Sequence, residues 1–153
     1  MKWMDRYLRD LRIRQAMQFI REGDRLLDVG CFDTTLLRLA SPRVREAVGI
    51  DPLATPMVEG NIRVVRGVLD EDAAAAHGLG AASFDCITML AVLEHVPDPA
   101  AMARRCAALL APAGRIVITV PDAKVDLILA VLRRLRLIHG MSLEEHHGYD
   151  TAQ

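Results

Sequence analysis

Residues 25–37, with the sequence RLLDVGCFDTTLL, constrain the fold of this chain more than any other segment. An apolar run leads into Gly30, a short polar turn follows, and apolar residues at helical spacing resume at Leu36 and Leu37. A short apolar run closed by turn residues is typical of a buried parallel strand. The junction of a strand, a tight turn and a helix N-terminus presents backbone N–H groups to an anionic or polar ligand. The segment therefore predicts a ligand-binding turn at the end of a first strand.

The rest of the chain alternates strands and helices with short connections. The predicted strands are residues 25–29, 47–50, 61–66, 84–90 and 115–120. The predicted helices are residues 3–21, the segment from the first turn to position 40, and residues 70–76, 99–111 and 125–138. Asp98 and Pro99 have the residue types expected for the N-cap and first position of a helix. The alternation predicts an open, mainly parallel α/β sheet with helices on both faces and right-handed crossovers.

Composition limits the classes to which the chain can belong. With 153 residues, 52% of them hydrophobic, we expect one domain over residues 1–153, with an N-terminal helix (3–21), a core (25–122) and a C-terminal helix and tail (124–153). The net charge of −1 gives no field that would attract nucleic acid, and the arginines of the first helix are read as a solvated face rather than an RNA-binding one. Three cysteines without ligand spacing argue against disulfides and structural zinc.

The sequence shows no signal peptide and no membrane-spanning segment. The charged N-terminus has no signal-peptide core, and no apolar run is long enough to span a membrane, so we expect a cytoplasmic protein without stable membrane insertion. Residues 127–138 could instead lie on a membrane surface, although packing against the sheet explains them better. Adjacent acidic and histidine residues at positions 144–147 are read as an exposed tail, so no metal site is predicted.

Strand ends place the candidate site. In open α/β sheets ligands bind outside the carboxyl ends of the strands, where the strand order reverses. This rule gathers residues 30–34, Asp51, the loop at 67–70 and residues 90–95 around one crevice. Asp51 ends the second strand, 21 residues after Gly30, where a carboxylate can accept hydrogen bonds from both hydroxyls of a ribose. The alternative is that Asp51 only begins a turn with Pro52.

The glycine pattern separates two nucleoside-binding folds. A dinucleotide fold requires glycine at positions 30, 32 and 35, and only Gly30 is present. Four segments, LLDVGC, VGIDP, SFDCITMLAVLEHVPDP and LLAPAGRIVITVPD, instead resemble class I S-adenosylmethionine-dependent methyltransferases, especially the type-11-like group that acts on small molecules. The resemblance covers residues 26–122 in the order of the family. It implies a Rossmann-like fold, S-adenosyl-L-methionine as cofactor and a small-molecule acceptor.

The resemblance also implies individual roles. Asp28 and Gly30 would border the methionine moiety, Asp51 would hold the ribose, and the strand exit at Met89 and Leu90 would pass beneath the methionine part. An acidic residue that the family uses for adenine is replaced by Val68, which leaves Asp70 as a shifted substitute. The full implied cofactor-binding set is Asp28, Gly30, Cys31, Phe32, Asp51, Pro52, Val68, Leu69, Asp70, Met89 and Leu90.

Two departures from the family keep a second interpretation open. The family places glycine at positions 32 and 34 because the backbone there approaches the ligand or takes a positive φ, whereas this chain has Phe32 and Thr34. Asp33 adds a negative charge near the expected position of the cofactor carboxylate. The alternative to an enzyme is therefore a degenerate, non-catalytic domain that serves as a binding or interaction module.

The chemistry needs few residues, because a sulfonium methyl group is already activated. A general base is needed only for a hydroxyl acceptor, and His95 is the candidate; its alternative role is a structural corner before the Asp98 cap. The family fold usually continues with a helix and an antiparallel strand pair, and the pattern of this sequence predicts neither after residue 138. We therefore expect the strand at 115–120 to be an exposed edge, covered by a second copy in a homodimer or by another segment.

Overall fold

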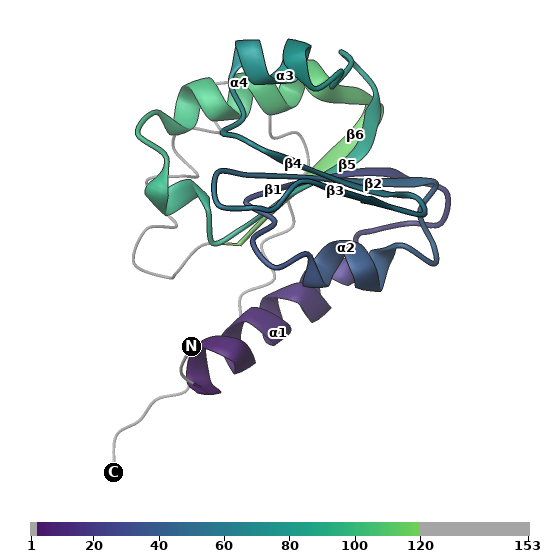
Figure 1. Cartoon of the computed structure of the whole chain (residues 1–153), viewed down its shortest axis with the longest axis vertical. Helices are drawn as coiled ribbons and strands as arrows, with labels where there is room; N and C mark the ends of the chain where they lie inside the picture. The colour runs from purple at the N-terminus through teal and green to yellow at the C-terminus, as the bar shows by residue number, and fades with distance from the viewer. Residues whose placement is uncertain (1–2, 120–153) are drawn as a thin grey trace.

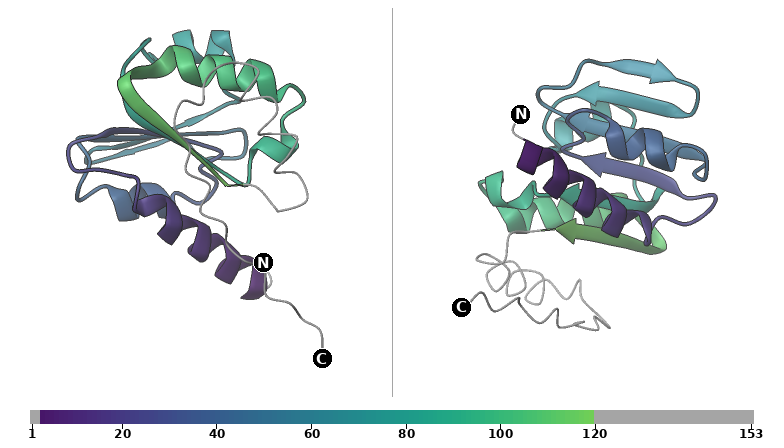
Figure 2. Two further views of the ribbon diagram at one scale, coloured as in Figure 1. Left: turned by 180° about the vertical axis from the view of Figure 1, so that it is seen from behind. Right: turned by 90° about the horizontal axis from the view of Figure 1, so that it is seen from below.

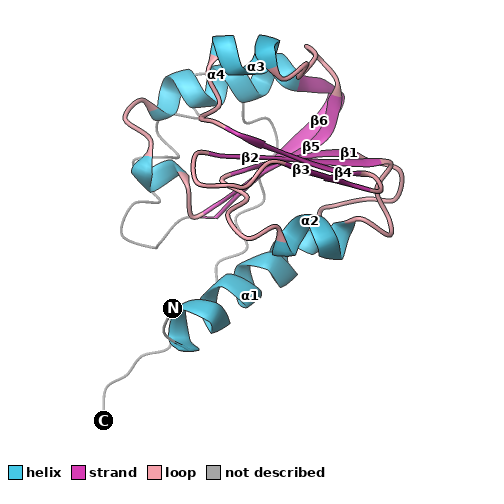
Figure 3. Ribbon diagram, in the orientation of Figure 1, coloured by secondary structure: helices cyan, strands magenta, loops and turns pink. Residues whose placement is uncertain are grey.

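The computed structural model describes residues 3–119 and shows a six-stranded sheet between two layers of helices (Figures 1 and 3). The strands are β1 (Arg25–Val29), β2 (Glu46–Asp51), β3 (Met57–Glu59), β4 (Ile62–Arg66), β5 (Phe84–Leu90) and β6 (Leu110–Thr119). The helices are α1 (Trp3–Met17), α2 (Thr35–Ala40), α3 (Glu71–Ala76), the 3₁₀ turn η1 (Leu93–His95) and α4 (Pro99–Leu109).

The sheet has the order β3-β4-β2-β1-β5-β6, and every neighbouring pair is parallel except the antiparallel pair β3 and β4. The predicted open, mainly parallel sheet is therefore confirmed. Strand β3 was not predicted, because three residues with Val58 largely exposed give no apolar run. A turn through Gly60, with φ +58°, joins β3 to β4.

Helices cover both faces of the sheet, as expected. The sheet lies between α1 and α2 on one side and α3 and α4 on the other, and the right panel of Figure 2 shows the side covered by α1 and α2. Alternate residues of β1 serve the two faces, since Leu26 packs in the cluster with Leu37 whereas Leu27 packs in the cluster with Met102. Both faces of the central strands are therefore buried, which explains their nearly continuous apolar sequence.

Helix α1 packs one of its sides against the domain. Ile13, Ala16 and Ile20, in and just after α1, are buried, whereas the apolar residues Tyr7 and Leu11 are exposed. The helix also ends at Met17 rather than at position 21. Two apolar lines run along this segment, and packing against the body of the domain selects the one that contains Ile13. The choice matters because it sets which arginines face the sheet edge.

The start of α4 agrees with its sequence signals, and its end does not. The Asp98 carboxylate accepts a hydrogen bond from the Ala101 N–H at 2.9 Å, which confirms the predicted N-cap. The helix ends at Leu109, before the predicted stop at positions 112–114, because Leu110 already pairs with Phe84. Strand β6 then shifts register before Arg115 pairs with Cys86.

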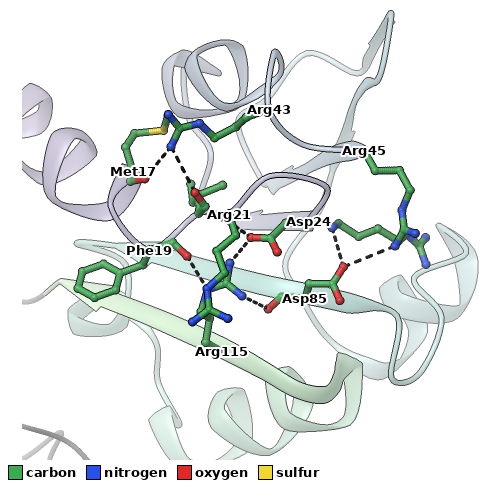
Figure 4. Close-up of polar contacts among 10 residues, drawn as sticks. Met17, Phe19, Arg21, Asp24, Arg43, Arg45, Asp85 and Arg115 are labelled. Atoms are coloured by element: carbon green, nitrogen blue, oxygen red, sulfur yellow. Dashed lines mark hydrogen bonds and ion pairs between the residues drawn. The ribbon is translucent and has the colours of Figure 1, made fainter.

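A polar network fixes the connection between α1 and β1 at the amino ends of the strands (Figure 4). The Arg115 guanidinium of β6 pairs with the buried Asp24 carboxylate and donates hydrogen bonds to the carbonyls of Phe19 and Asp85. Arg43 donates to the carbonyl of Met17 at 3.2 Å, at the C-terminus of α1. The Arg43 bond satisfies a carbonyl that the helix leaves open, and the Arg115 bonds join the residues after α1 to β5 and β6, so this end of α1 is held on the domain.

Strand β6 is the last strand at one edge of the sheet within the described residues. An edge with unpaired N–H and C=O groups can pair with another chain, and dimer formation at this edge stays a prediction. The expected helix at 125–138, the tail and positions 144–147 lie outside the described residues.

Candidate functional site

The carboxyl ends of three strands meet at one edge of the sheet. Val29 pairs with Ile50, and β5 runs parallel on the other side of β1. The first residue after β1, Gly30, still donates its N–H to the Ile50 carbonyl at 2.8 Å. The last residues of β2 and β5, Asp51 and Leu90, therefore lie on either side of the turn that follows β1.

The turn keeps the backbone form of a glycine-rich loop with few glycines. Gly30 has φ +79°, Phe32 has φ +42° and Thr34 has φ +63°. The Thr34 N–H donates to the Cys31 carbonyl at 2.9 Å and closes the turn. The positions where the sequence lacks the family's glycines therefore take the positive φ that glycine would take. Phe32 is 58% exposed, so it lines the site without closing it.

Thr34 is under backbone strain, because a β-branched residue rarely adopts the left-handed region. Its side chain makes no capping hydrogen bond to α2 that would offset this cost. We expect Thr34→Asn to raise the free energy of unfolding by about 1 kcal/mol, because asparagine tolerates this region better. Thr34→Ala, which keeps the Cβ atom at the same φ, should gain less. Urea unfolding of both variants checks this, and equal gains would contradict the explanation.

Asp51 connects the two loops that border the site. One carboxylate oxygen accepts the N–H of Phe32 at 3.2 Å, and the other accepts the N–H of Leu53 at 2.7 Å. The residue is 8% exposed and lines the cavity, so its carboxylate does not point into bulk water. Because each carboxylate oxygen has two acceptor positions, Asp51 can accept further hydrogen bonds from a bound diol.

Asp28 lies deeper, at the floor of the site. Its Oδ1 accepts the Thr88 hydroxyl at 2.7 Å, and both residues are buried. Burial raises the pKa of Asp28 to about 7; the Thr88 hydrogen bond opposes this rise, and the charges of Asp51 and Asp33 add to it. A positive charge bound in the cavity would therefore stabilise the ionised form of Asp28.

Arg9 reaches the site from α1. Its guanidinium pairs with the Asp33 carboxylate, and both residues line the cavity. The same carboxylate accepts the Thr35 hydroxyl at 2.7 Å and the Thr35 N–H at 3.2 Å. Sequence reasoning missed Arg9 because it assigned the arginines of the first helix to a solvated face. Only the burial of Ile13, one turn later on the same face, places Arg9 over the site.

These residues enclose a cavity of about 490 Å³, within the size range of small-molecule sites. Eight of the residues predicted for the site line it, namely Asp28, Gly30, Cys31, Phe32, Asp51, Pro52, Leu90 and His95. Burial raises the pKa of the Cys31 thiol to about 12, so Cys31 adds apolar surface rather than a reactive thiolate. The lining combines apolar walls with a few charged groups, which is the usual character of a ligand site.

Four predicted residues do not line the cavity. The Leu69 and Met89 side chains belong to the core cluster on the far face of the sheet. Val68 is exposed, and Asp70 accepts the Ala73 N–H at 2.6 Å as the N-cap of α3. The side chain of Asp70 therefore has a local structural role, and contacts of these four residues with a ligand stay predictions.

His95 lines the mouth of the cavity from η1, and its side chain is 80% exposed. Its Nε2 lies 4.0 Å from the nearest Glu94 carboxylate oxygen, too far for a hydrogen bond. Glu94 therefore does not orient the ring as in a tightly coupled acid–base pair. The ring can still contact a molecule in the cavity.

A strand-end carboxylate beside a tight turn after the first strand defines the class of α/β proteins that bind a nucleoside at the sheet edge. The sequence matches the family described as "Methyltransferase domain" over residues 1–153, and the chain belongs to this family. A ubiquinone biosynthesis O-methyltransferase of Stutzerimonas stutzeri is 32% identical over 99 residues, which are 61% of this chain and 43% of that protein.

Solved structures are similar in fold. An S-adenosylmethionine-dependent methyltransferase from Mesorhizobium loti is 26% identical, with a TM-score of 0.55 over 68% of this chain and 49% of that one. A SAM-dependent methyltransferase from Aquifex aeolicus is 16% identical and shares the fold, with a TM-score of 0.62 over 80% of this chain and 77% of that one. The Rossmann-like architecture is therefore confirmed.

The chain spans less than half the length of the curated relatives that it matches. Within residues 3–119, none of the helices combines the length and hydrophobicity needed to cross a membrane.

Proposed function

We propose that this chain binds S-adenosyl-L-methionine in the cavity at the carboxyl ends of β1, β2 and β5 and supports methyl transfer to a small-molecule acceptor. The observation that carries the proposal is Asp51, a carboxylate at the end of β2 that lines the cavity and is held in place by two backbone N–H groups. Membership of the methyltransferase family supports it. When bound, the cofactor supplies a methyl group on a sulfonium, which is already an activated electrophile.

The residues of the cavity fit the parts of this cofactor. Asp51 can accept from the ribose hydroxyls, and Asp28 can face the positive charges of the methionine part. Arg9 is the one cation on the lining within the described residues besides the titratable His95, and it can pair with the cofactor carboxylate while keeping its contact with Asp33. The apolar walls, which include Leu53 and Val92, suit an adenine ring and exclude water.

The acceptor would enter at the mouth of the cavity beside His95. The main contribution of the protein is then in-line placement of the acceptor atom, about 3 Å from the methyl carbon, in a site with little water. If the acceptor is a hydroxyl, as the name of the matched relative suggests, His95 would accept its proton. We place the protein in the cytoplasm, without a nucleic acid partner, on the same sequence arguments as before.

Binding measurements test the proposal directly. We expect S-adenosylmethionine to bind the wild-type chain in calorimetry, and Asp51→Ala to weaken binding about 100-fold, because two hydrogen bonds to a charged group are lost. Asp98→Ala is the matched control, since it removes a helix cap outside the cavity and should change affinity less than about threefold. Thermal unfolding of each variant confirms that the fold persists.

The result also decides between the two interpretations. Absence of binding of both S-adenosylmethionine and S-adenosylhomocysteine at millimolar concentration would overturn the proposal and favour a degenerate domain. Binding without methyl transfer in a screen of small phenols, amines and thiols would favour a binding module. Transfer to any of them excludes the non-catalytic interpretation.

A further inference from the structure

Acidic side chains outnumber arginines on the lining of the cavity. Three carboxylates, Asp28, Asp33 and Asp51, line it, and Arg9 is the single guanidinium that does so among residues 3–119. His95 is the remaining titratable base on the lining, and it lies at the exposed mouth. When all three carboxylates are ionised, the cavity therefore carries a net negative charge that one arginine does not balance.

Asp28 is the carboxylate with the fewest compensating partners. Asp51 accepts from two backbone N–H groups and Asp33 pairs with Arg9, whereas the hydrogen-bond donor to Asp28 is the uncharged Thr88 hydroxyl. The groups that face Asp28 from the neighbouring elements are Asp51 at the end of β2, Asp33 and Cys31 in the turn, and Thr88 of β5. No cation from these elements neutralises it, which agrees with its raised pKa.

The reaction changes the charge of the ligand at this place. During transfer the bond between sulfur and the methyl carbon breaks and its electron pair stays on sulfur, while the acceptor atom forms a bond to the methyl carbon and releases its proton. The sulfonium thus becomes a neutral thioether. With its ammonium and carboxylate groups unchanged, the cofactor goes from a net charge of +1 to zero.

We propose that the excess of carboxylates lets this site distinguish the cofactor from its demethylated product by charge, an inference that rests on the proposed function. The ionisation of Asp28 sets how strongly the site distinguishes the two. A low-dielectric cavity amplifies the attraction between Asp28 and a positive ligand, and the part of this attraction that comes from the sulfonium disappears when the methyl group is transferred. Product release is thereby favoured after each transfer. Protonation of Asp28 removes the preference, so the site discriminates less at lower pH.

The experiment compares three ligands at two pH values. Calorimetry measures the affinities of S-adenosylmethionine, S-adenosylhomocysteine and sinefungin, in which a carbon bearing an ammonium group replaces the sulfonium, at pH 5.5 and 7.5. All three carry the same α-amino group, so its titration cancels in affinity ratios. For the wild type we expect the ratio of either charged ligand to S-adenosylhomocysteine to fall at least fivefold from pH 7.5 to pH 5.5. In Asp28→Asn the ratios should be low and change less than twofold.

Controls separate Asp28 from the other titrating groups. Because imidazoles commonly change charge between pH 5 and 8, the series is repeated in His95→Gln, where the fivefold change should persist. Thr88→Val, which removes the hydrogen bond that favours the charged form, should move the change to higher pH. Equal pH dependence of all three ligands in the wild type, or a fivefold change that survives Asp28→Asn, would overturn this inference and leave the proposed function intact. Absence of binding by all three ligands would overturn both.

Discussion

Gly30→Ala is expected to lower the free energy of unfolding by about 3 kcal/mol, whereas Gly23→Ala should lower it by about 1 kcal/mol. Both glycines have nearly the same left-handed backbone, with φ +79° and +78°. A Cβ atom at Gly30 would lie 2.3 Å from Cγ2 of Val92, while one at Gly23 would meet nothing within 4 Å. The backbone strain is therefore matched, and the difference reports the close packing of the turn against the segment after β5.

Urea unfolding at constant pH measures both costs. The double variant Gly30→Ala/Val92→Ala provides the internal check, because shortening Val92 makes room for the new methyl group. We expect the double variant to lose less than the sum of the single losses, with a coupling of about 1 kcal/mol or more. Equal costs for the two glycine variants would mean that steric contact at Gly30 contributes nothing and that only φ matters.

Asp28→Asn is expected to stabilise the protein above pH 7 while it weakens cofactor binding. Burial raises the pKa of Asp28 from 3.8 to about 7, with a smaller opposing effect of the Thr88 hydrogen bond and further increases from Asp51 and Asp33. A shift of this size corresponds to roughly 4 kcal/mol between the two protonation states. The wild type therefore bears the cost of a buried charge at neutral and higher pH, and the asparagine variant does not.

The direction of the pH dependence follows from proton binding. Below pH 4 Asp28 is protonated in the folded and unfolded states, and it contributes no pH dependence. Between about pH 4 and pH 7 the folded state holds a proton that the unfolded state has released, so stability falls as pH rises. Above about pH 8 the loss is complete and constant.

Urea unfolding of the wild type and Asp28→Asn at pH 5, 6, 7 and 8 measures this contribution. The difference in unfolding free energy should grow with pH in favour of the variant and level off near pH 8. Thr88→Val should have the opposite effect to Asp28→Asn, because it raises the pKa of Asp28 further. We expect it to lower the free energy of unfolding at pH 8 below that of the wild type. Parallel pH profiles of wild type and Asp28→Asn would show that Asp28 titrates alike in both states. A stabilising change that harms binding is typical of a functional site.

Much of the fold follows from local sequence signals. The strand β5 has the predicted bounds, α3 lies within the predicted helix at 70–76, and the predicted N-cap Asp98 begins α4, because capping and short apolar runs depend on neighbouring residues. The same signals fail where an element is short or partners with a distant one. Strand β3 forms only because β4 offers it an edge, and α4 ends early because Leu110 pairs with Phe84.

Some residues of the candidate site could be predicted from the sequence, and others required the structure. Gly30 and Asp51 could be predicted because Gly30 follows β1 and Asp51 ends β2, and the carboxyl ends of neighbouring parallel strands necessarily meet at one edge. Leu69 and Met89 were also predicted beside the ligand, and contact of these two residues with a ligand stays a prediction. That their side chains pack in the core cluster required the structure, because it depends on the distant residues around them.

The sequence by itself determined that the chain forms a parallel α/β sheet with a turn after β1 and a carboxylate at the end of β2, since these features depend on residues close together along the chain. Only the tertiary structure decided that Arg9 lies over the cavity, that Phe32 lines it without filling it, and that Asp28 carries an uncompensated charge. Each of these depends on which distant groups surround a residue. Local periodicity does not contain that information, because packing chooses between faces that the sequence leaves equivalent.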